Sequence, residues 1–476
     1  MQACVRGFWF SSLTCVLGFT YGYISPSNFD LEDAYVQDGI LAPERQAYKA
    51  FVVRQNDSMT LAGVQKLEEF ASNGLPIVFY GGIPDSVLSR SDEKDLESIY
   101  SILENMSKME KVHIVPEGSL ARSLISDVGI TPKVAVETDG RWMTYWREDE
   151  VSAHSYVTLY NDASGASLGE GRSSGKVTVA AALGAPYVYD AWTGEVIAVR
   201  VCQHDEENMT IPVSLAGNQT AILAFHHDET PQCSLDRLPE GVSVRAASAA
   251  APTFELLNRN RAAETFECHV EQTIKLPAAA SAVELSDWTL IVESWTAPNK
   301  TSTDADYTYE AVKTNSSAFS LPSLQPWSEI SDSLRNTSGV GFYSTNFTWP
   351  PGSASDAQAG SSGAEIDLAY ILNTARVWVN GHQVAPLDPV APVADISSFL
   401  VDGDNSITIV TATTLGAAVR EYWEQISVAG VPVTLTAPAP REEAAQGLVA
   451  PVKLIPYSST KIEGCYNLSY RRDEVI

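Results

Sequence analysis

The sequence predicts a multidomain protein in which a small parallel α/β domain is followed by a β-sandwich and a jelly roll. The chain has 476 residues, of which 45% are hydrophobic, and single hydrophobic cores stop growing well below this length. Up to about residue 136, short apolar runs alternate with helical periodicity, which is the order of a parallel α/β unit. Beyond about residue 130, apolar and polar residues alternate with period two, as in strands with one buried face.

Three apolar runs in the first part predict buried parallel strands, at residues 50–53, 77–80 and 112–115. The segments between them, TLAGVQKLEEFASNG and SDEKDLESIYSILENMSKM, repeat apolar residues at helical spacing. We therefore expect a flavodoxin-like α/β domain over residues 21–131. Gly81-Gly82 follow the second strand, where such folds often bind ligands. No G-x-G-x-x-G motif and no Walker lysine accompany them, so we expect no nucleotide and no other cofactor.

Strand-like segments make up the rest of the chain. The first group predicts a β-sandwich over residues 132–250 and comprises HSYVTLYNDA, GKVTVAAALG, APYVYDAWTGEVIAVRV and QTAILAFHH. The second group predicts a jelly roll over residues 265–460 and comprises DWTLIVESW, GFYSTNFTW, AEIDLAYI, ARVWVNGHQV and NSITIVTATTL. Within ARVWVNGHQV, Asn380-Gly381 interrupts the alternation and predicts a type I′ hairpin turn. Trp378 is then a partly buried sheet residue.

Glycosylation sequons of the form Asn-x-Ser/Thr indicate the secretory route. Nine of the 17 asparagines lie in such sequons, whereas chance would give about three in a chain of this Ser/Thr content. They are Asn56, Asn105, Asn208, Asn218, Asn299, Asn315, Asn336, Asn346 and Asn467. Near the N-terminus, Arg6 precedes an apolar run that is too short to cross a bilayer but suits a signal peptide over residues 1–20. We expect a secreted glycoprotein.

Cysteine usage is consistent with an oxidising compartment. If the signal peptide is removed, four cysteines remain, namely Cys202, Cys233, Cys268 and Cys465. Cys202 and Cys233 flank one β-rich stretch, so we favour a disulfide between them, while the pairing of Cys268 with Cys465 stays open. No C-x-x-C motif is present, and we expect no metal site.

The charge balance excludes several kinds of partner. The chain carries 31 basic and 59 acidic residues, a formal charge of −28, which repels phosphate backbones and anionic lipid. No later run is long enough to span a membrane. We therefore expect neither nucleic acid nor a membrane as a partner.

Two local groupings resemble catalytic or metal motifs. Gly165-Ala166-Ser167-Leu168-Gly169 matches the nucleophile elbow of serine hydrolases, with Asp190 and His226 downstream, but the elbow needs a helix after the serine and EGRSSGKVTV predicts a turn and a strand. The segments His226-His227-Asp228 and His204-Asp205 contain metal-ligand residue types. Neighbouring histidines on a strand point to opposite faces, so we expect a solvated loop.

Several segments resemble, in the same order, the part of α-L-rhamnosidase-type glycoside hydrolases that follows the catalytic barrel. They are Tyr23-Ile24-Ser25-Pro26 with Asn28-Phe29, GILAPERQAYKAFVV, YVYDAWTGEV, Ser338 to Tyr343, WVNG, DISSFLVDGDNSITI and GLVAPVKLIPY. The later ones resemble a terminal galactose-binding-like jelly roll that is shared with β-galactosidase-like enzymes. Such enzymes mount their acid and base on a (β/α)₈ barrel. No room for that barrel precedes Tyr21, so no catalytic residue is transferred to this sequence.

The resemblance implies a secreted carbohydrate-binding glycoprotein that lacks its own catalytic barrel. Candidate residues for stacking on a sugar are Trp327, Tyr343 and Trp349. One alternative is a truncated or split glycosidase that hydrolyses rhamnosides, with the barrel on a separate catalytic chain. Another, from a different class, is a serine esterase that uses Ser167. The sequence leaves open whether the chain is an enzyme.

Overall fold

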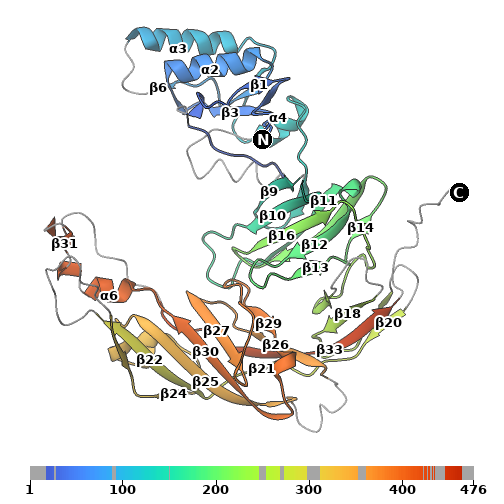
Figure 1. The fold of residues 1–476 in the computed structure, drawn as a ribbon, viewed down its shortest axis with the longest axis vertical. Coiled ribbons are helices and arrows are strands. Elements are labelled where there is room, and N and C mark those ends of the chain that lie inside the picture. The colour runs from blue at the N-terminus through green and yellow to red at the C-terminus, as the bar shows by residue number, and fades with distance from the viewer. Residues whose placement is uncertain are drawn as a thin grey trace. The chain divides into compact units, whose positions relative to one another are not determined.

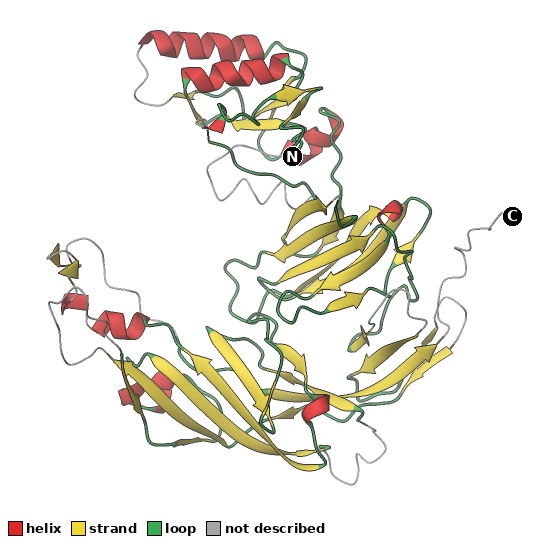
Figure 2. Ribbon diagram, in the orientation of Figure 1, coloured by secondary structure: helices red, strands yellow, loops and turns green. Residues whose placement is uncertain are grey.

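The computed structural model describes the chain in thirteen segments. They are residues 18–25, 28–87, 93–149, 151–245, 253–267, 273–296, 311–351, 361–421, 423–425, 427–428, 431–432, 434 and 445–463. Strands dominate (Figures 1 and 2). The chain divides into two compact units: unit 1 comprises Met1–Ser164, Arg172–Tyr187 and Gln203–Pro231, and unit 2 comprises Gly165–Gly171, Val188–Cys202 and Gln232–Ile476. Most of the expected signal peptide lies outside the described residues, as do Cys268, Cys465, Asn299 and Asn467.

The first part of unit 1 contains a parallel sheet in the order β3-β5-β7. Its strands and helices are β3 (Phe51–Arg54), α2 (Leu61–Ser72), β5 (Ile77–Tyr80), α3 (Glu93–Met106), β7 (Val112–Val115) and α4 (Leu120–Ser126). Short strands β1 (Val36–Gln37), β2 (Ile40–Leu41), β4 (Ser58–Met59) and β6 (Ser86–Val87) accompany them. Helices α2 and α3 lie side by side (Figure 1).

Successive strand residues in this sheet enter two different cores. Phe79 packs with Phe70 of α2 and Leu103 of α3, whereas Val78 packs with Leu124 of α4. Because side chains alternate across a strand, helices cover both faces, and the strands are continuous apolar runs. The three expected strands and their parallel pairing are therefore present.

Two antiparallel sheets follow between residues 135 and 226, mostly within unit 1, although residues 188–198 of these sheets belong to unit 2. The five-stranded sheet has the order β13-β12-β16-β10-β9 and the four-stranded sheet the order β14-β15-β11-β8. Their bounds are β8 (Ala135–Thr138), β9 (Trp142–Asp149), β10 (His154–Asn161), β11 (Ser173–Ala180), β12 (Ala185–Tyr189), β13 (Val196–Ala198), β14 (Gln203–His204), β15 (Asn208–Leu215) and β16 (Thr220–His226). Strand β10 alternates between half-buried and buried residues along its whole length, so one of its faces packs in the core.

Unit 2 contains a larger pair of antiparallel sheets. One has the order β17-β18-β33-β26-β29 with β21 beside β33, and the other has the order β23-β22-β25-β30-β27-β28 with β24 beside β22. The first comprises β17 (Val242–Arg245), β18 (Thr253–Asn258), β21 (Val283–Glu284), β26 (Gly363–Asp367), β29 (Val393–Asp395) and β33 (Lys453–Glu463). The second comprises β22 (Trp288–Thr296), β23 (Val312–Asn315), β24 (Phe319–Leu321), β25 (Gly339–Trp349), β27 (Thr374–Val379), β28 (His382–Gln383) and β30 (Gly403–Ala412).

The two sheets of unit 2 share one hydrophobic core. Leu290 and Ile409 enter it from the seven-stranded sheet, and Ile366 and Leu454 enter it from the six-stranded sheet. The remaining elements of unit 2 are β19 (Glu264–Glu267), β20 (Thr273–Leu276), α5 (Trp327–Ile330), α6 (Gly416–Glu421), β31 (Ser427–Val428) and β32 (Val431–Pro432).

The hairpin expected at Asn380-Gly381 is present. Trp378 pairs with Gln383, and Val379 pairs with His382. The loop between them is two residues long, and φ is 51° at Asn380 and 81° at Gly381, as a type I′ turn requires. Trp378 is half-buried. ARVWVNGHQV is therefore a structural turn, as its sequence indicates.

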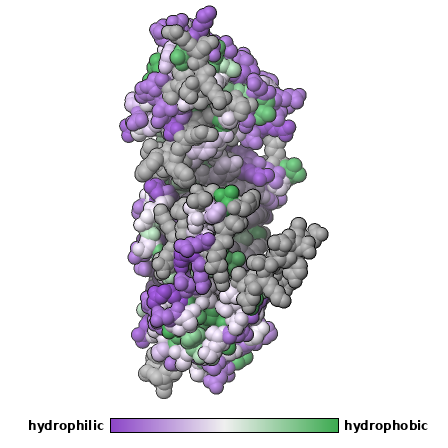
Figure 3. Space-filling view, turned by 90° about the vertical axis from the view of Figure 1, so that its left-hand side faces the viewer, coloured by the Kyte–Doolittle hydropathy of each residue, from purple (hydrophilic) through white to green (hydrophobic). Residues whose placement is uncertain are grey.

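The surface visible in Figure 3 is largely hydrophilic, with hydrophobic side chains gathered in patches. This is consistent with the formal charge of −28. Within the described segments, no helix is long and apolar enough to cross a membrane.

Candidate functional site

The three aromatic residues expected to stack on a sugar lie in the core of unit 2. Trp327 and Tyr343 are 0% exposed, and Trp349 is 8% exposed. Trp327 Nε1 donates a hydrogen bond to Tyr343 Oη over 2.7 Å, and the backbone N–H of Leu448 donates to the same oxygen over 3.0 Å. Buried rings offer no open face to a ligand, so these residues pack the core of unit 2 rather than form a binding platform.

The environment of Tyr343 is that of a structural hydroxyl. Burial raises the pKa of Tyr343 to about 12, although hydrogen bonds from Leu448 and Trp327 lower it in part. The phenol therefore stays protonated at physiological pH. The pattern of GVGFYSTNFTW contained a signal for this placement, because the sequon residue Asn346 must face outward and Tyr343, three positions away, then faces inward.

The expected disulfide is present in the structure. Cys202 and Cys233 are bonded, with 31 residues of separation and a Cα–Cα distance of 5.0 Å. The backbone N–H of Cys202 also donates a hydrogen bond to the carbonyl oxygen of Leu235, two residues after Cys233, over 3.0 Å. The bond therefore closes a loop at a place where the chain already pairs.

Ser167 does not have the geometry of a nucleophile elbow. It lies in a turn, and the N–H of Glu170 donates to its carbonyl oxygen over 3.0 Å. The next regular element is strand β11, so no helix follows to supply an oxyanion hole. The structure therefore gives the esterase alternative no support.

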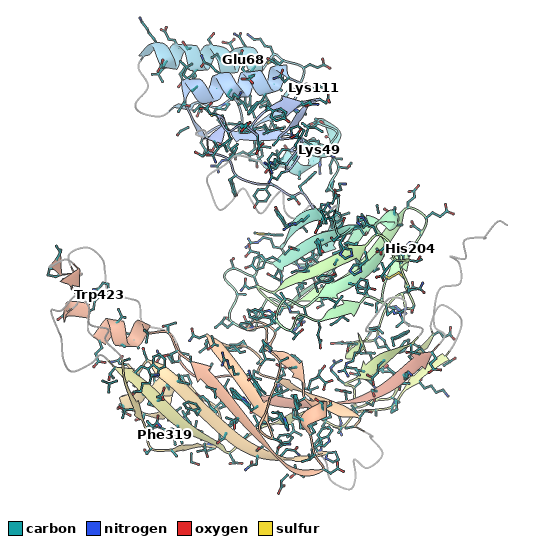
Figure 4. The ribbon with its side chains drawn as sticks, in the orientation of Figure 1. Lys49, Glu68, Lys111, His204, Phe319 and Trp423 are labelled. Carbon is teal, nitrogen blue, oxygen red and sulfur yellow. A yellow bond between two sulfur atoms is a disulfide. The ribbon has the colours of Figure 1, made fainter. Side chains whose placement is uncertain are left out.

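The histidine segments do not form a metal cluster. Among the residues the structure describes, no group of three His, Cys, Asp or Glu side chains is arranged to hold a metal ion. His204 lies on β14 of the four-stranded sheet (Figure 4), whereas His226 ends β16 of the five-stranded sheet.

Sequence reasoning missed a row of aromatic and imidazole rings on the outer face of the five-stranded sheet. We call this set, drawn from four adjacent strands, the aromatic row: Tyr145, His154, Tyr156, Tyr187 and His226. His154 is registered opposite His226, and Tyr156 is registered opposite Arg147, two positions from Tyr145. The other face of this sheet is buried, since Val157 and Leu159 of β10 are 0% exposed.

Three rings of the aromatic row stack on one another. The ring centroids of His154 and His226 lie 4.0 Å apart at 12°, and those of His226 and Tyr187 lie 4.2 Å apart at 29°. Tyr156 packs edge-on against His154, and its hydroxyl lies 3.3 Å from His154 Nδ1. These contacts restrict the ring orientations.

The carboxylate of Glu229 contacts one end of this stack. Glu229 accepts a hydrogen bond from Tyr187 Oη over 2.5 Å, and its other oxygen lies 3.2 Å from His226 Nδ1. At the opposite side of the row, Tyr145 is 53% exposed, and Arg147 is also exposed. The surface thus combines fixed rings, an open phenol and charged groups of both signs.

Such a surface has the chemistry that carbohydrate recognition needs. Aromatic rings stack on the apolar faces of pyranoses, and a few fixed polar groups orient the sugar hydroxyls. Sequence patterns could not reveal it, because it depends on which four strands are neighbours.

The seven described sequon asparagines share one property. All seven side chains are exposed, whereas only two of the eight other asparagines are. Asn218 and Asn336 accept hydrogen bonds through Oδ1, while a glycan is attached at Nδ2. The placement is the one that glycosylation requires.

Comparison with known proteins adds one fold relationship. No protein-family model matches the chain, and no curated protein matches it. A rhamnosidase from Novosphingobium sp. PP1Y is similar in structure, with a TM-score of 0.52 and 16% sequence identity, over 93% of this chain and 36% of the rhamnosidase.

Two other glycosidase structures show weaker similarity. A β-glucuronidase from Faecalibacterium prausnitzii has a TM-score of 0.23 and 18% identity over 37% of this chain and 31% of its own. An exo-carrageenase from Bacteroides ovatus has a TM-score of 0.26 and 10% identity over 45% and 26%. These two scores are too low to establish a shared fold. The chain therefore has a rhamnosidase-like fold and spans 36% of the length of the rhamnosidase it resembles.

Proposed function

We propose that this chain is a carbohydrate-binding glycoprotein, equivalent to the C-terminal, non-barrel part of an α-L-rhamnosidase-type glycoside hydrolase. The observation that supports it is the asymmetry of the structural similarity, which covers 93% of this chain but 36% of the rhamnosidase. In the described segments, the paired parallel strands form one sheet of three, β3, β5 and β7, and one short pair, β4 and β6, whereas a catalytic barrel has eight in a single closed sheet.

One pair of carboxylates that lie opposite each other in the six-stranded sheet forms ion pairs with arginines. Glu365 is registered directly opposite Asp395. Arg259 donates to both oxygens of Glu365, over 2.6 and 2.5 Å, and Arg245 forms an ion pair with Asp395. A glycosidase needs one carboxyl that gives up a proton and another that attacks or activates water. Both carboxylates are paired with arginines, so we assign them to the stability of the sheet.

The aromatic row is the surface on which we place sugar binding. Tyr145 presents the most exposed ring and Tyr156 is half-buried, whereas Tyr187 is 4% exposed. The stack of His154, His226 and Tyr187 supports Tyr156 from one side. With one or two stacked rings, we expect a Kd nearer about 1 mM than about 1 μM, which corresponds to roughly 4 kcal/mol.

The test is a pair of assays on the full chain. We expect no hydrolysis of aryl α-L-rhamnosides and weak binding on an oligosaccharide array, because binding alone contributes little to turnover. Tyr156→Ala should remove the binding, whereas Tyr100→Ala, which changes another exposed tyrosine on helix α3, should keep it. Turnover that a single Asp or Glu substitution abolishes would contradict the proposal and favour the split-glycosidase alternative. Turnover that Ser167→Ala abolishes would favour an esterase.

We also propose that the protein is secreted and N-glycosylated. The exposure of all seven described sequon asparagines and the Cys202–Cys233 disulfide support this. Peptide mapping of protein recovered from the native host should find glycans on several sequons. Reduced, unglycosylated protein from the cytosol would contradict it.

A further inference from the structure

The outer face of the seven-stranded sheet in unit 2 has an apolar centre. We call it the outer strip, and it consists of Ile291, Val340, Phe342, Val410 and Ala412. Ile291 and Phe342 are registered opposite each other and are 37% and 39% exposed. Phe342 is registered opposite Val410, and Val340 opposite Ala412. The strip therefore runs across three neighbouring strands on the side that faces away from the core.

Two sequon asparagines lie on this same face, one further along β25 and one on β23, next to β22. Asn346 is four residues from Phe342 on β25, so its side chain points the same way, and it is exposed. Asn315 is exposed on β23 and registered opposite Glu293, which in turn pairs with Val340. Paired residues share a face of the sheet, so glycans at both positions would emerge beside the apolar centre.

Both attachment points are close enough for a glycan to reach the strip. Four residues of strand separate Asn346 from Phe342, about 13 Å. Asn315 and Ile291 are diagonal neighbours, about 7–8 Å apart. A core N-glycan of several pyranose rings is longer than either distance, and its C–H faces pack on aromatic and aliphatic side chains.

The side chains beside Asn315 are themselves fixed. Trp295 Nε1 donates to a carboxylate oxygen of Glu293 over 2.7 Å, and Lys313 Nζ lies 4.4 Å from the centroid of the Trp295 ring. The first sugar at Asn315 would therefore have ordered side chains beside it on this face.

We propose that N-glycans on Asn315 and Asn346 fold back over the outer strip and cover it. The ligand of this surface is thus an oligosaccharide attached to the same chain. The inference rests on the proposed glycosylation and identifies the protein surface that two of the glycans contact. It explains why an apolar centre is retained on an outward sheet face, where exposed apolar patches otherwise invite association.

The experiment uses the secreted full chain and removes the two glycans without changing the asparagines. Ser317→Ala and Thr348→Ala destroy the sequons of Asn315 and Asn346, and Ser107→Ala destroys that of Asn105 on α3 as a matched control. Peptide mapping first establishes occupancy, and binding of a hydrophobic dye then reports exposure of the strip.

We expect the double variant Ser317→Ala/Thr348→Ala to bind at least roughly threefold more dye, and Ser107→Ala to match the unaltered protein. Adding Phe342→Thr to the double variant should abolish the increase. Unchanged dye binding after loss of both glycans would overturn the inference while leaving the glycosylation in place. Unoccupied Asn315 and Asn346 would instead overturn the glycosylation at these sites. A glycosylated dimer that Phe342→Thr dissociates would show that a second copy covers the strip, which also contradicts the proposal.

Discussion

At the scale of single residues, the two turn positions of the Asn380-Gly381 hairpin serve different purposes. Asn380 Nδ2 donates to the carbonyl oxygen of Phe399 over 2.9 Å and to Asn405 Oδ1 over 2.7 Å, and the N–H of Ser406 donates to Asn380 Oδ1 over 2.9 Å. A Cβ added at Gly381 would meet nothing within 4 Å. Glycine is therefore required there only by its φ of 81°.

This difference makes a prediction about stability. Gly381→Val places a β-branched residue at positive φ and should destabilise unit 2 by at least about 1 kcal/mol. Gly381→Asn should cost less, because asparagine tolerates that conformation. Thermal unfolding measures both. An unchanged transition in the valine variant would show that the positive φ of this turn does not limit the stability of unit 2.

The buried hydroxyl of Tyr343 makes a second prediction. Tyr343→Phe keeps the ring but leaves the N–H donors of Trp327 and Leu448 without their acceptor. Two buried donors lose their bond, so we expect a loss of about 1–3 kcal/mol in denaturant unfolding. The control Tyr145→Phe changes an exposed tyrosine and should stay within about 0.5 kcal/mol. Equal stabilities for the two variants would show that the core bond is not needed.

The sequence predicted the conformation of some residues but not the burial of others. The hairpin was predictable because its cause is local, an Asn-Gly pair between alternating residues. The burial of Trp327 and Tyr343 was not recognised. The sequon at Asn346 indicates the inward face for Tyr343, whereas Trp327 lies on the short helix α5 and its burial depends on contacts with Tyr343 and with the distant Gln446.

At the scale of elements, the Cys202–Cys233 disulfide makes a prediction that depends on loop length. Closing a loop of 31 residues lowers the entropy of the unfolded chain, which raises the free energy of unfolding by about 3–4 kcal/mol at room temperature. Cys202→Ser/Cys233→Ser should lose stability of that order in denaturant unfolding. Non-reducing mass spectrometry of the unaltered protein should find the same link, and a different pairing of these cysteines would refute it.

A charged contact joins three strands of the six-stranded sheet and predicts a pH dependence. Asp395 of β29 accepts a hydrogen bond from Tyr457 of β33 over 2.8 Å and forms an ion pair with Arg245 of β17. Burial raises the pKa of Asp395, but hydrogen bonds from Ser397 and Tyr457 and the charge of Arg245 together hold it below the ordinary value.

A lowered pKa in the folded state means that the contact stabilises the protein above the ordinary aspartate pKa, near about 4. The contribution is lost as the pH falls through the lowered folded-state value. The free energy of unfolding should therefore drop more steeply below about pH 4 in the unaltered protein than in Asp395→Asn. Parallel curves in this range would contradict the assignment.

Strands were predictable from the sequence, but their neighbours were not. Strand β33 is last along the chain, yet it lies between β18 and β26. Alternation predicts that such a segment has one buried face, whereas its pairing partners are set by the packing of the whole sandwich. The same limit hid the aromatic row, because His154 and His226 meet only when β10 pairs with β16.

At the scale of the whole molecule, the periodicities indicated that parallel strands with helices precede antiparallel sheets, and the structure has that order. The bounds of the three expected domains stay a prediction. The aromatic row was not predictable at this scale, because aromatic residues occur throughout the strands and only the register selects those that share a face of the sheet.

The central claim is that the chain binds sugar on the aromatic row without hydrolysing it. Calorimetric titration of the full chain with a rhamnose-containing oligosaccharide tests it most directly, with Tyr156→Ala and Tyr100→Ala titrated beside it. The account predicts a Kd of about 1 mM for the unaltered protein and for Tyr100→Ala, and no measurable heat of binding for Tyr156→Ala. Equal affinity in all three proteins, or no binding in any, would contradict it.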